Sequence, residues 1–446
     1  MRLKRSSTLK KLFPLQLAAV IFLTVSGGPY GLEPLLIYAG KNGALLLLII
    51  TPILWDVPTI FTVLELNSMM PVTGGYYQWV KRALGLRFAF YEGWWTWLYT
   101  FVDLAIYPVL FVEYLSFFFP QIEVYKIPVC LFIIWSSAGL NILGIVPVGK
   151  TSILLSTVVL IPFLILFGIE FSNHSQTFSY PSFSLNGLKF SSIGMALYTV
   201  IWNFLGWDNT TTYAEEVDKP IRSYLRSVFI AFGLIFLIYF IAIITAQKSG
   251  IDFTVLNEEG FPALGLLIGG NWLGALLSAG GMASALGLFS AVLLSVSRVP
   301  EVMAKDKLLP KKLDALHPKF KTPYVSIIVC SIIVSVMILW TFADLIIIDV
   351  TLYGAGLFLE FLTLIVLRIK APNENRPFKI PLNIAGLCLM TIIPFSVYAI
   401  ALAGAFSEEA TTLKPALFAV VALITAEIAW RIIVWRRKII DEKNFL

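Results

Sequence analysis

Acidic side chains lie deep within apolar stretches of this chain, where an unpaired charge is costly. Two stretches place polar or small residues at helical spacing on one face: Glu92, Thr96, Tyr99, Asp103 and Tyr107 in residues 88–118, and Asp349, Tyr353, Gly356 and Glu360 in residues 344–368. Asp208 adds a further acid in the stretch 191–216. An Asp at the centre of a membrane helix costs about 2.5–3.5 kcal/mol, and no Lys or Arg lies at the centre of any such stretch. The acids therefore either bind a cationic ligand or are protonated; the alternative is that a neighbouring helix holds each one neutral or hydrogen-bonded.

The elements that must position these acids are transmembrane helices. Of the 446 residues, 58% are hydrophobic and 13% are charged, against about 25% charged in soluble chains. The mean hydropathy of +0.84 excludes a soluble globule, a disordered chain, collagen and a nucleic-acid-binding protein. Apolar runs between charged, Pro or Gly residues predict an all-α polytopic membrane protein with twelve transmembrane helices, at residues 13–39, 43–70, 88–118, 126–147, 151–171, 191–216, 223–247, 270–298, 323–342, 344–368, 381–406 and 413–435.

The cations are distributed unevenly between alternate loops. With the N-terminus inside, 28 of the 33 Lys and Arg fall in cytoplasmic segments and five in outer segments. Cytoplasmic loops are enriched in Lys and Arg, and a missing or extra helix would exchange the sides downstream and remove this asymmetry. We therefore expect a multi-pass protein of the plasma (inner) membrane, surrounded by the lipid bilayer, with residues 1–12 and 436–446 both in the cytoplasm.

Two of the expected helices contain sequences that interrupt a helix. The first has Ser26-Gly27-Gly28-Pro29-Tyr30-Gly31 at its middle, and the sixth has the weaker interruption Trp202-Asn203-Phe204-Leu205-Gly206-Trp207-Asp208. In a helix a glycine costs about 1 kcal/mol and a proline about 3 kcal/mol. An unpaired backbone group in hydrocarbon costs several kcal/mol, so such a break persists only where it lines a cavity or meets a ligand. A proline kink explains one break; two at corresponding positions indicate a binding site.

The places of the two breaks predict the domain organisation. They begin the first and sixth helices, which is the arrangement of a five-plus-five inverted repeat with its substrate site at the bilayer midplane. The first repeat would span residues 13–171 and the second 191–368, with two additional helices within 381–435. A half-helix beginning near Gly31 would direct free N–H groups at a carboxylate. Carbonyls released around Trp202 and Leu205 would suit an ammonium group. An amino acid carries both groups, whereas a polyamine carries only the second.

Metal and catalytic chemistry find no support in the sequence. The three cysteines, Cys130, Cys330 and Cys388, lie in separate apolar stretches, and His174 and His317 lie in loops far apart. We expect no disulfide framework, metal site or cofactor, and no enzyme, because neither HExxH nor paired histidines occur. A channel would need a repeated carbonyl filter, and a transporter-like nutrient sensor usually carries long soluble extensions. Both stay as alternatives to a carrier.

Several sequence motifs of the chain resemble those of the amino acid–polyamine–organocation (APC) superfamily. They are SGGPYG, PVTGGYYQWVKRALG, WNFLGWDNTTTYAEEVDKP and RVPEVMAKDKLLPKKLDALHPKFKTP; SGGPYGLE, DLAIYPVLFVEYL, LYGAGLFLEF and LRIKAPNENRPFKIP are similar to the polyamine-uptake branch. The resemblance implies the inverted-repeat fold and alternating access. It implies that Ser26, Gly27 and Gly28 meet any substrate carboxylate, and that backbone at Trp202 and Leu205 takes the amine. Trp202 and Asp208 resemble the aromatic gate and acidic coupling residue of arginine/agmatine exchangers, and Asp103 the residue that faces the distal end of a long substrate.

Two departures from the superfamily pattern shape the functional prediction. Proton-coupled relatives often carry a lysine on the fifth helix, where this chain has Ser156-Thr157-Val158, so coupling is expected through Asp208, Asp103 or Glu360. Phe289 and Val292 occupy the region of the distal aromatic gate, so guanidinium stacking is unsupported. We expect a proton-coupled secondary transporter of an amino acid or polyamine, favouring a cationic amine, with a neutral amino acid permease or an exchanger as the alternative. Tyr30, Asn203 and Tyr353 complete the set of expected substrate contacts.

Overall fold

The computed structural model describes residues 11–172, 183–339, 342–405, 407 and 413–444. Within them the regular structure is helical apart from two isolated β-bridges. The α-helices are α1 (Pro14–Val25), α2 (Glu33–Thr51), α3 (Val57–Met69), α4 (Gly75–Leu84), α5 (Leu86–Ser116), α6 (Lys126–Ile142), α7 (Ile145–Ser172), α8 (Phe190–Trp202), α9 (Pro220–Ser249), α10 (Phe253–Glu259), α11 (Phe261–Gly269), α12 (Asn271–Val296), α13 (Arg298–Lys305), α14 (Tyr324–Met337), α15 (Phe342–Lys370), α16 (Ile384–Ala405) and α17 (Leu413–Asn444). Short 3-10 turns cover Pro120–Tyr125, Asn209–Thr212, Ala214–Glu216 and Lys311–Asp314, and one π-helical turn covers Pro52–Asp56.

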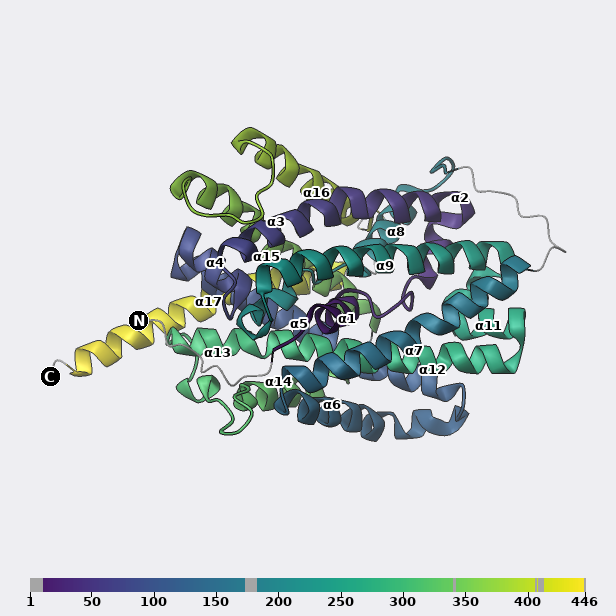
Figure 1. The fold of residues 1–446 in the computed structure, drawn as a ribbon, viewed down its shortest axis with the longest axis horizontal. Coiled ribbons are helices and arrows are strands. Elements are labelled where there is room, and N and C mark those ends of the chain that lie inside the picture. The colour runs from purple at the N-terminus through teal and green to yellow at the C-terminus, as the bar shows by residue number, and fades with distance from the viewer. Residues whose placement is uncertain (1–10, 173–182, 340–341, 406, 408–412, 445–446) are drawn as a thin grey trace.

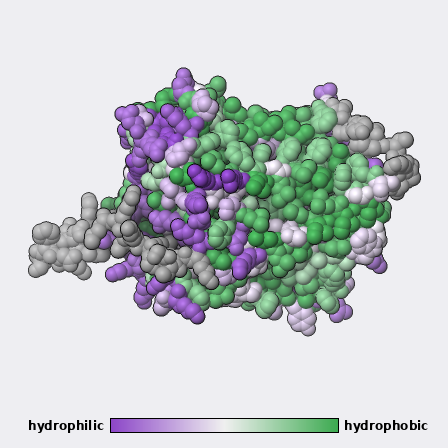
Figure 2. All heavy atoms as spheres, viewed as in Figure 1, coloured by the Kyte–Doolittle hydropathy of each residue, from purple (hydrophilic) through white to green (hydrophobic). Residues whose placement is uncertain are grey.

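The helices have the length and polarity of membrane spans. In the described residues eight helical segments are long and apolar enough to cross a bilayer: Glu33–Met69, Leu86–Ser116, Pro120–Ile142, Ile145–Ser172, Pro220–Ser249, Asn271–Lys305, Asp349–Lys370 and Ile384–Ala405. Three shorter apolar helices, α1, α8 and α14, accompany them. Figure 2 shows apolar residues over most of the visible face and hydrophilic residues gathered at the end where α4 and α13 lie in Figure 1. So large an exposed apolar surface is that of a protein surrounded by lipid.

The first interruption separates α1 from α2. Helix α1 ends at Val25 and α2 begins at Glu33, and between them Gly27, Gly28 and Gly31 have φ angles of +63°, +103° and +103°. These angles lie in the left-handed region, which a side chain disfavours. A Cβ on Gly27 would also lie 2.5 Å from a side-chain carbon of α12. The glycines therefore both turn the chain and let it approach its neighbour.

The second interruption ends α8 at Trp202. From the sequence, residues 191–216 are expected to form one interrupted span. In the structure, two 3-10 turns follow α8, and no α-helix resumes before α9. The hydroxyl of Thr211 donates to the carbonyl of Asp208 at 2.6 Å, and that of Thr212 to the carbonyl of Asn209 at 2.9 Å. Such local side-chain bonds to the backbone compete with the α-helical ladder, which accounts for the difference.

Helix α12 lies at the centre and brings both interruptions close to α5. It packs against α5, α7, α11 and α1. Two of its glycines receive large side chains: a Cβ would lie 2.3 Å from the Tyr30 hydroxyl at Gly280 and 2.5 Å from the Tyr114 ring at Gly281. Small residues at helix interfaces let membrane helices approach closely. The glycines of α12 therefore set how near the α1–α2 interruption comes to α5.

Candidate functional site

A central cavity lies between the two interruptions. It is about 30 Å³ in volume and is lined from α1, the two interruptions, α5, α12 and α15. Six of the expected site residues line it: Ser26, Tyr30, Asp103, Trp202, Asn203 and Leu205. Within the described residues, Asp103 and Asp349 are its only charged lining residues, since no described Lys, Arg or His lines it. The lining residues do not include Gly27, Gly28 or Tyr353. Tyr353 nevertheless contacts two residues that line the cavity, Gly206 and Tyr99.

Four of the five backbone N–H groups from Ser26 to Gly31 are already hydrogen-bonded within the chain. The N–H groups of Ser26 and Gly27 both donate, at 2.9 Å, to one carbonyl in the last turn of α1. The N–H of Gly28 donates to the Ser26 hydroxyl at 3.0 Å, and that of Gly31 to the Glu33 carboxylate at 2.6 Å. The expectation of free N–H groups for a substrate carboxylate therefore meets donors that protein acceptors occupy in this conformation.

Asn203 links the two interruptions. Its amide nitrogen donates to the carbonyl of Gly31 at 3.0 Å and to that of Thr199 at 2.8 Å, while its own carbonyl accepts from the Tyr239 hydroxyl at 2.7 Å. The carbonyl of Leu205 has no hydrogen-bond donor within the described residues. Asn203 thus holds the two breaks in position. Leu205, two residues further along, lines the cavity.

A second pair of acids, Asp208 and Glu360, lies outside the lining of the central cavity. The Tyr353 hydroxyl donates to Asp208 at 2.9 Å and accepts from the Gly206 N–H at 3.3 Å. The carboxyl group of Glu360 lies near that of Asp208, and neither oxygen of Glu360 has a hydrogen-bond partner within the described residues. Two neighbouring buried carboxyl groups favour a proton on one of them. This arrangement can therefore hold a proton away from water.

Two tyrosines separate this acid group from the central cavity. The rings of Tyr99 and Tyr353 meet edge to face with centroids 5.3 Å apart. The Tyr99 hydroxyl donates to the Asn209 side chain at 2.9 Å. Tyr99 lines the cavity, and Tyr353 contacts Asp208 on the other side. Asp103 and Tyr107, on the same helix, belong to the cavity side.

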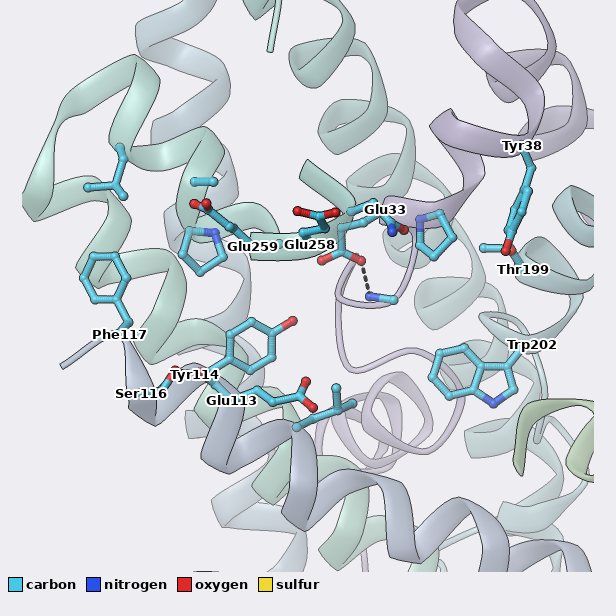
Figure 3. A pocket seen from close by; sticks show the side chains of 18 of the residues that line it. Glu33, Tyr38, Glu113, Tyr114, Ser116, Phe117, Thr199, Trp202, Glu258 and Glu259 are labelled. Atoms are coloured by element: carbon cyan, nitrogen blue, oxygen red, sulfur yellow. Dashed lines mark hydrogen bonds between the residues drawn. The ribbon is translucent and has the colours of Figure 1, made fainter. Parts of the chain in front are cut away.

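A larger cavity, the vestibule, opens at the α11 end. It measures about 740 Å³, and Leu110, Tyr114 and Trp202 line both it and the central cavity. In the part of the chain that the structure describes, no Lys, Arg or His lines it and five acids do: Glu33, Glu113, Glu123, Glu258 and Glu259. Figure 3 shows four of them around the opening, with Trp202 and Tyr114 deeper. Sequence reasoning missed these acids because each lies near a helix end, where a charge is ordinary.

The opposite end is crossed by ion pairs and hydrogen bonds. Arg298 is fully buried and meets Glu216 at 3.2 Å. Lys81 and the Tyr77 hydroxyl both reach the carboxylate of Asp306, at 2.6 and 2.7 Å. These residues come from α4, α13 and the segment after the second interruption. Together they link α4, α13 and that segment across the α13 end of the molecule, which we call the sealed end.

The N-terminal segment also contacts the sealed end. The N–H of Leu12 donates to the carbonyl of Glu216 at 3.0 Å, and the N–H of Asp218 donates to the carbonyl of Leu12 at 2.9 Å. This parallel bridge joins the chain before α1 to the chain after the second interruption. Main-chain hydrogen bonds therefore hold these two flanking segments together.

The chain is similar to known transport proteins over most of its length. Residues 12–426 match the amino acid permease family. The chain is 31% identical over 420 residues to the polyamine transporter RMV1 of Arabidopsis thaliana, covering 93% of this chain and 84% of that one. It is 29% identical over 388 residues to the polyamine transporter PUT1 of Oryza sativa subsp. japonica, covering 86% and 72%.

A more distant relative carries a different name. The serine/threonine exchanger SteT of Bacillus subtilis (strain 168) is 24% identical over 351 residues, covering 72% of this chain and 74% of that one. The family match covers most of the chain, and these relatives are named as transporters of polyamines or amino acids. The chain belongs to the amino acid permease family of the APC superfamily, and it is a helical membrane transporter.

Proposed function

We propose that this protein is a proton-coupled secondary transporter that moves a cationic amine across the membrane by alternating access. The observation that carries the proposal is the central cavity, which two interrupted helices line and whose only charged lining residues are Asp103 and Asp349. An ammonium group would complete such a site by pairing with a carboxylate and with the open carbonyl of Leu205. The polyamine transporters of Arabidopsis and rice among its relatives support the same substrate class.

The proposed architecture has twelve spans in two inverted repeats. Residues 13–171 and 191–368 would form the repeats, with 381–435 supplying two further helices. The cations at the sealed end favour placing that end, and both termini, in the cytoplasm of a cell whose plasma membrane the protein spans. The vestibule would then open outward, and Trp202 and Tyr114, which line both cavities, would move to admit substrate. Movement is required because about 30 Å³ holds little more than one water molecule.

The proposed coupling site is the Asp208–Glu360 pair. These carboxyl groups lie next to the unwound end of α8, and Tyr353 connects Asp208 to the backbone of Gly206. A change in the protonation of the pair would therefore alter contacts of the interrupted segment itself. Coupling through these acids replaces the fifth-helix lysine that this chain lacks.

Counterflow of labelled putrescine in proteoliposomes tests the proposal. We expect the wild-type protein to exchange external labelled putrescine against internal unlabelled putrescine, which neither a channel nor a sensor does. Asp103→Asn should abolish this uptake while the protein still inserts in the membrane. The matched control is Asp56→Asn, because Asp56 is also fully buried but contacts Trp207 and does not line the cavity. Absence of counterflow for putrescine, lysine, arginine and leucine in the wild type would contradict the transport proposal.

A further inference from the structure

Asp349 is a buried carboxylate in the central cavity with an open acceptor. It is 2% exposed, and its Oδ1 has no hydrogen-bond partner within the described residues. Asp349 and Trp202 both line the central cavity. A buried carboxylate oxygen without a donor is strongly destabilised unless a ligand or a proton meets it. The open oxygen therefore indicates a contact that the protein itself does not supply.

The second carboxylate of the cavity comes from a neighbouring helix. Asp103 lies on α5 and Asp349 on α15, and these two helices pack directly against each other. Both side chains line the same cavity, and no cationic side chain lines it. A ligand with one ammonium group would neutralise only one of these carboxylates. A ligand with two ammonium groups would neutralise both, which matters where water does not screen the charges.

The α1–α2 interruption disfavours a carboxylate on the same ligand. Three of its N–H groups already donate to acceptors within α1 and Ser26, and that of Gly31 donates to Glu33. An amino acid would bring a carboxylate into a cavity whose charged residues are two acids, and it would have to displace these contacts to bind. A linear diamine brings no anion.

We propose that the central site is a two-point site for a doubly protonated linear diamine or the terminal diamine unit of a polyamine, with one ammonium group at Asp103 and the other at Asp349. This assignment rests on the transport function proposed above and adds the substrate class and the second anchoring residue. The methylene chain of the ligand lies between the two acids, beside Tyr30 and Tyr114, which line the same cavity. The distance between ammonium groups is then a determinant of specificity.

The test compares two ligands of equal size on the purified full-length protein. Putrescine and pentylamine each have six non-hydrogen atoms, but only putrescine has a second ammonium group. We expect wild-type protein to bind putrescine at least tenfold more tightly than pentylamine, measured by isothermal titration calorimetry. In Asp349→Asn the ratio should fall to about one through weaker putrescine binding, with pentylamine binding retained. Asp56→Asn, the buried control, should keep the wild-type ratio.

Retained pentylamine binding also shows that Asp349→Asn is folded. If that variant does not fold, the conservative Asp349→Glu variant replaces it: it should keep the preference for a diamine but shift the preferred diamine to one with a shorter chain. Equal binding of the two ligands by the wild type overturns the two-point site, as does an unchanged ratio in Asp349→Asn. Either result, together with intact counterflow of an amine or amino acid, leaves the transport function standing and removes only the assignment of Asp349.

Discussion

The vestibule and the sealed end differ in how they use charge. Within the described residues the vestibule is lined by five acids and no base, and its cavity of about 740 Å³ leads toward Trp202 and Tyr114. At the sealed end, acids and bases are paired with each other, as in the Arg298–Glu216 and Lys81–Asp306 contacts. An excess of acids around a wide cavity attracts cations, whereas paired charges hold helices together. One end is therefore suited to collecting an amine and the other to preventing its passage until the pairs separate.

The largest expected effect comes from breaking the buried pair at the sealed end. Arg298→Ala removes the cation that contacts Glu216 and opens a space in a region where Arg298 was fully buried. Removing one partner of a buried pair costs about 3–5 kcal/mol, so the free energy of unfolding in detergent should fall by that amount. The matched control is Lys126→Ala at the other end, where the pair with Glu123 is exposed and spans 3.8 Å. A similar, small loss in both variants would show that the sealed end is not held by this pair.

A smaller effect is expected in the accessibility of the two ends to a thiol reagent. Thr199 lines the vestibule, whereas Thr212 is fully buried and donates to the carbonyl of Ser295. Single cysteines at these positions should differ at least about tenfold in their rate of alkylation, because only an accessible thiolate reacts. The background needs Cys388→Ser, since Cys388 is exposed. Equal rates would mean that the two ends are equally open.

The smallest effect should come from the rim of the vestibule. Glu258 and Glu259 are exposed acids on α10, so their charge acts on an approaching cation through solvent. Replacing both with Gln should raise the KM for putrescine about threefold at low salt, and less at high salt, because ions screen such fields. Asp314→Asn at the sealed end is the control and should leave this KM unchanged. A salt-independent increase would indicate direct contact with substrate instead of attraction.

The interruptions are foreseeable because their causes are local. The run from Ser26 to Gly31 contains three glycines and a proline, and no tertiary contact is needed to see that an α-helix fails there. The acceptors of its N–H groups are local too: a serine two residues before Gly28 and a glutamate two residues after Gly31. The glycine and proline pattern alone predicts free N–H groups, because it does not show that the side chains of Ser26 and Glu33 accept from Gly28 and Gly31.

The vestibule and the partners of the acids could not be foreseen in the same way. Glu33 begins α2, Glu113 lies near the end of α5, and Glu258 and Glu259 end α10. Only the packing of these separate helices brings the four acids to one opening (Figure 3). Helical spacing places Asp103 on the same face as Tyr99, but spacing within one helix does not reveal that Asp349 faces the same cavity from α15. Such pairs follow from tertiary structure alone.

The bridge at Leu12 consists of main-chain atoms, which every residue except proline supplies. Alanine scanning of this segment would consequently leave the contact unaltered and miss it. Replacing Leu12 with proline, or its amide with an ester, deletes the donor that reaches Glu216. In the alternating access proposed above, opening of the sealed end would break the hydrogen bonds of this bridge. A bulky fusion attached just before Leu12 should therefore slow transport.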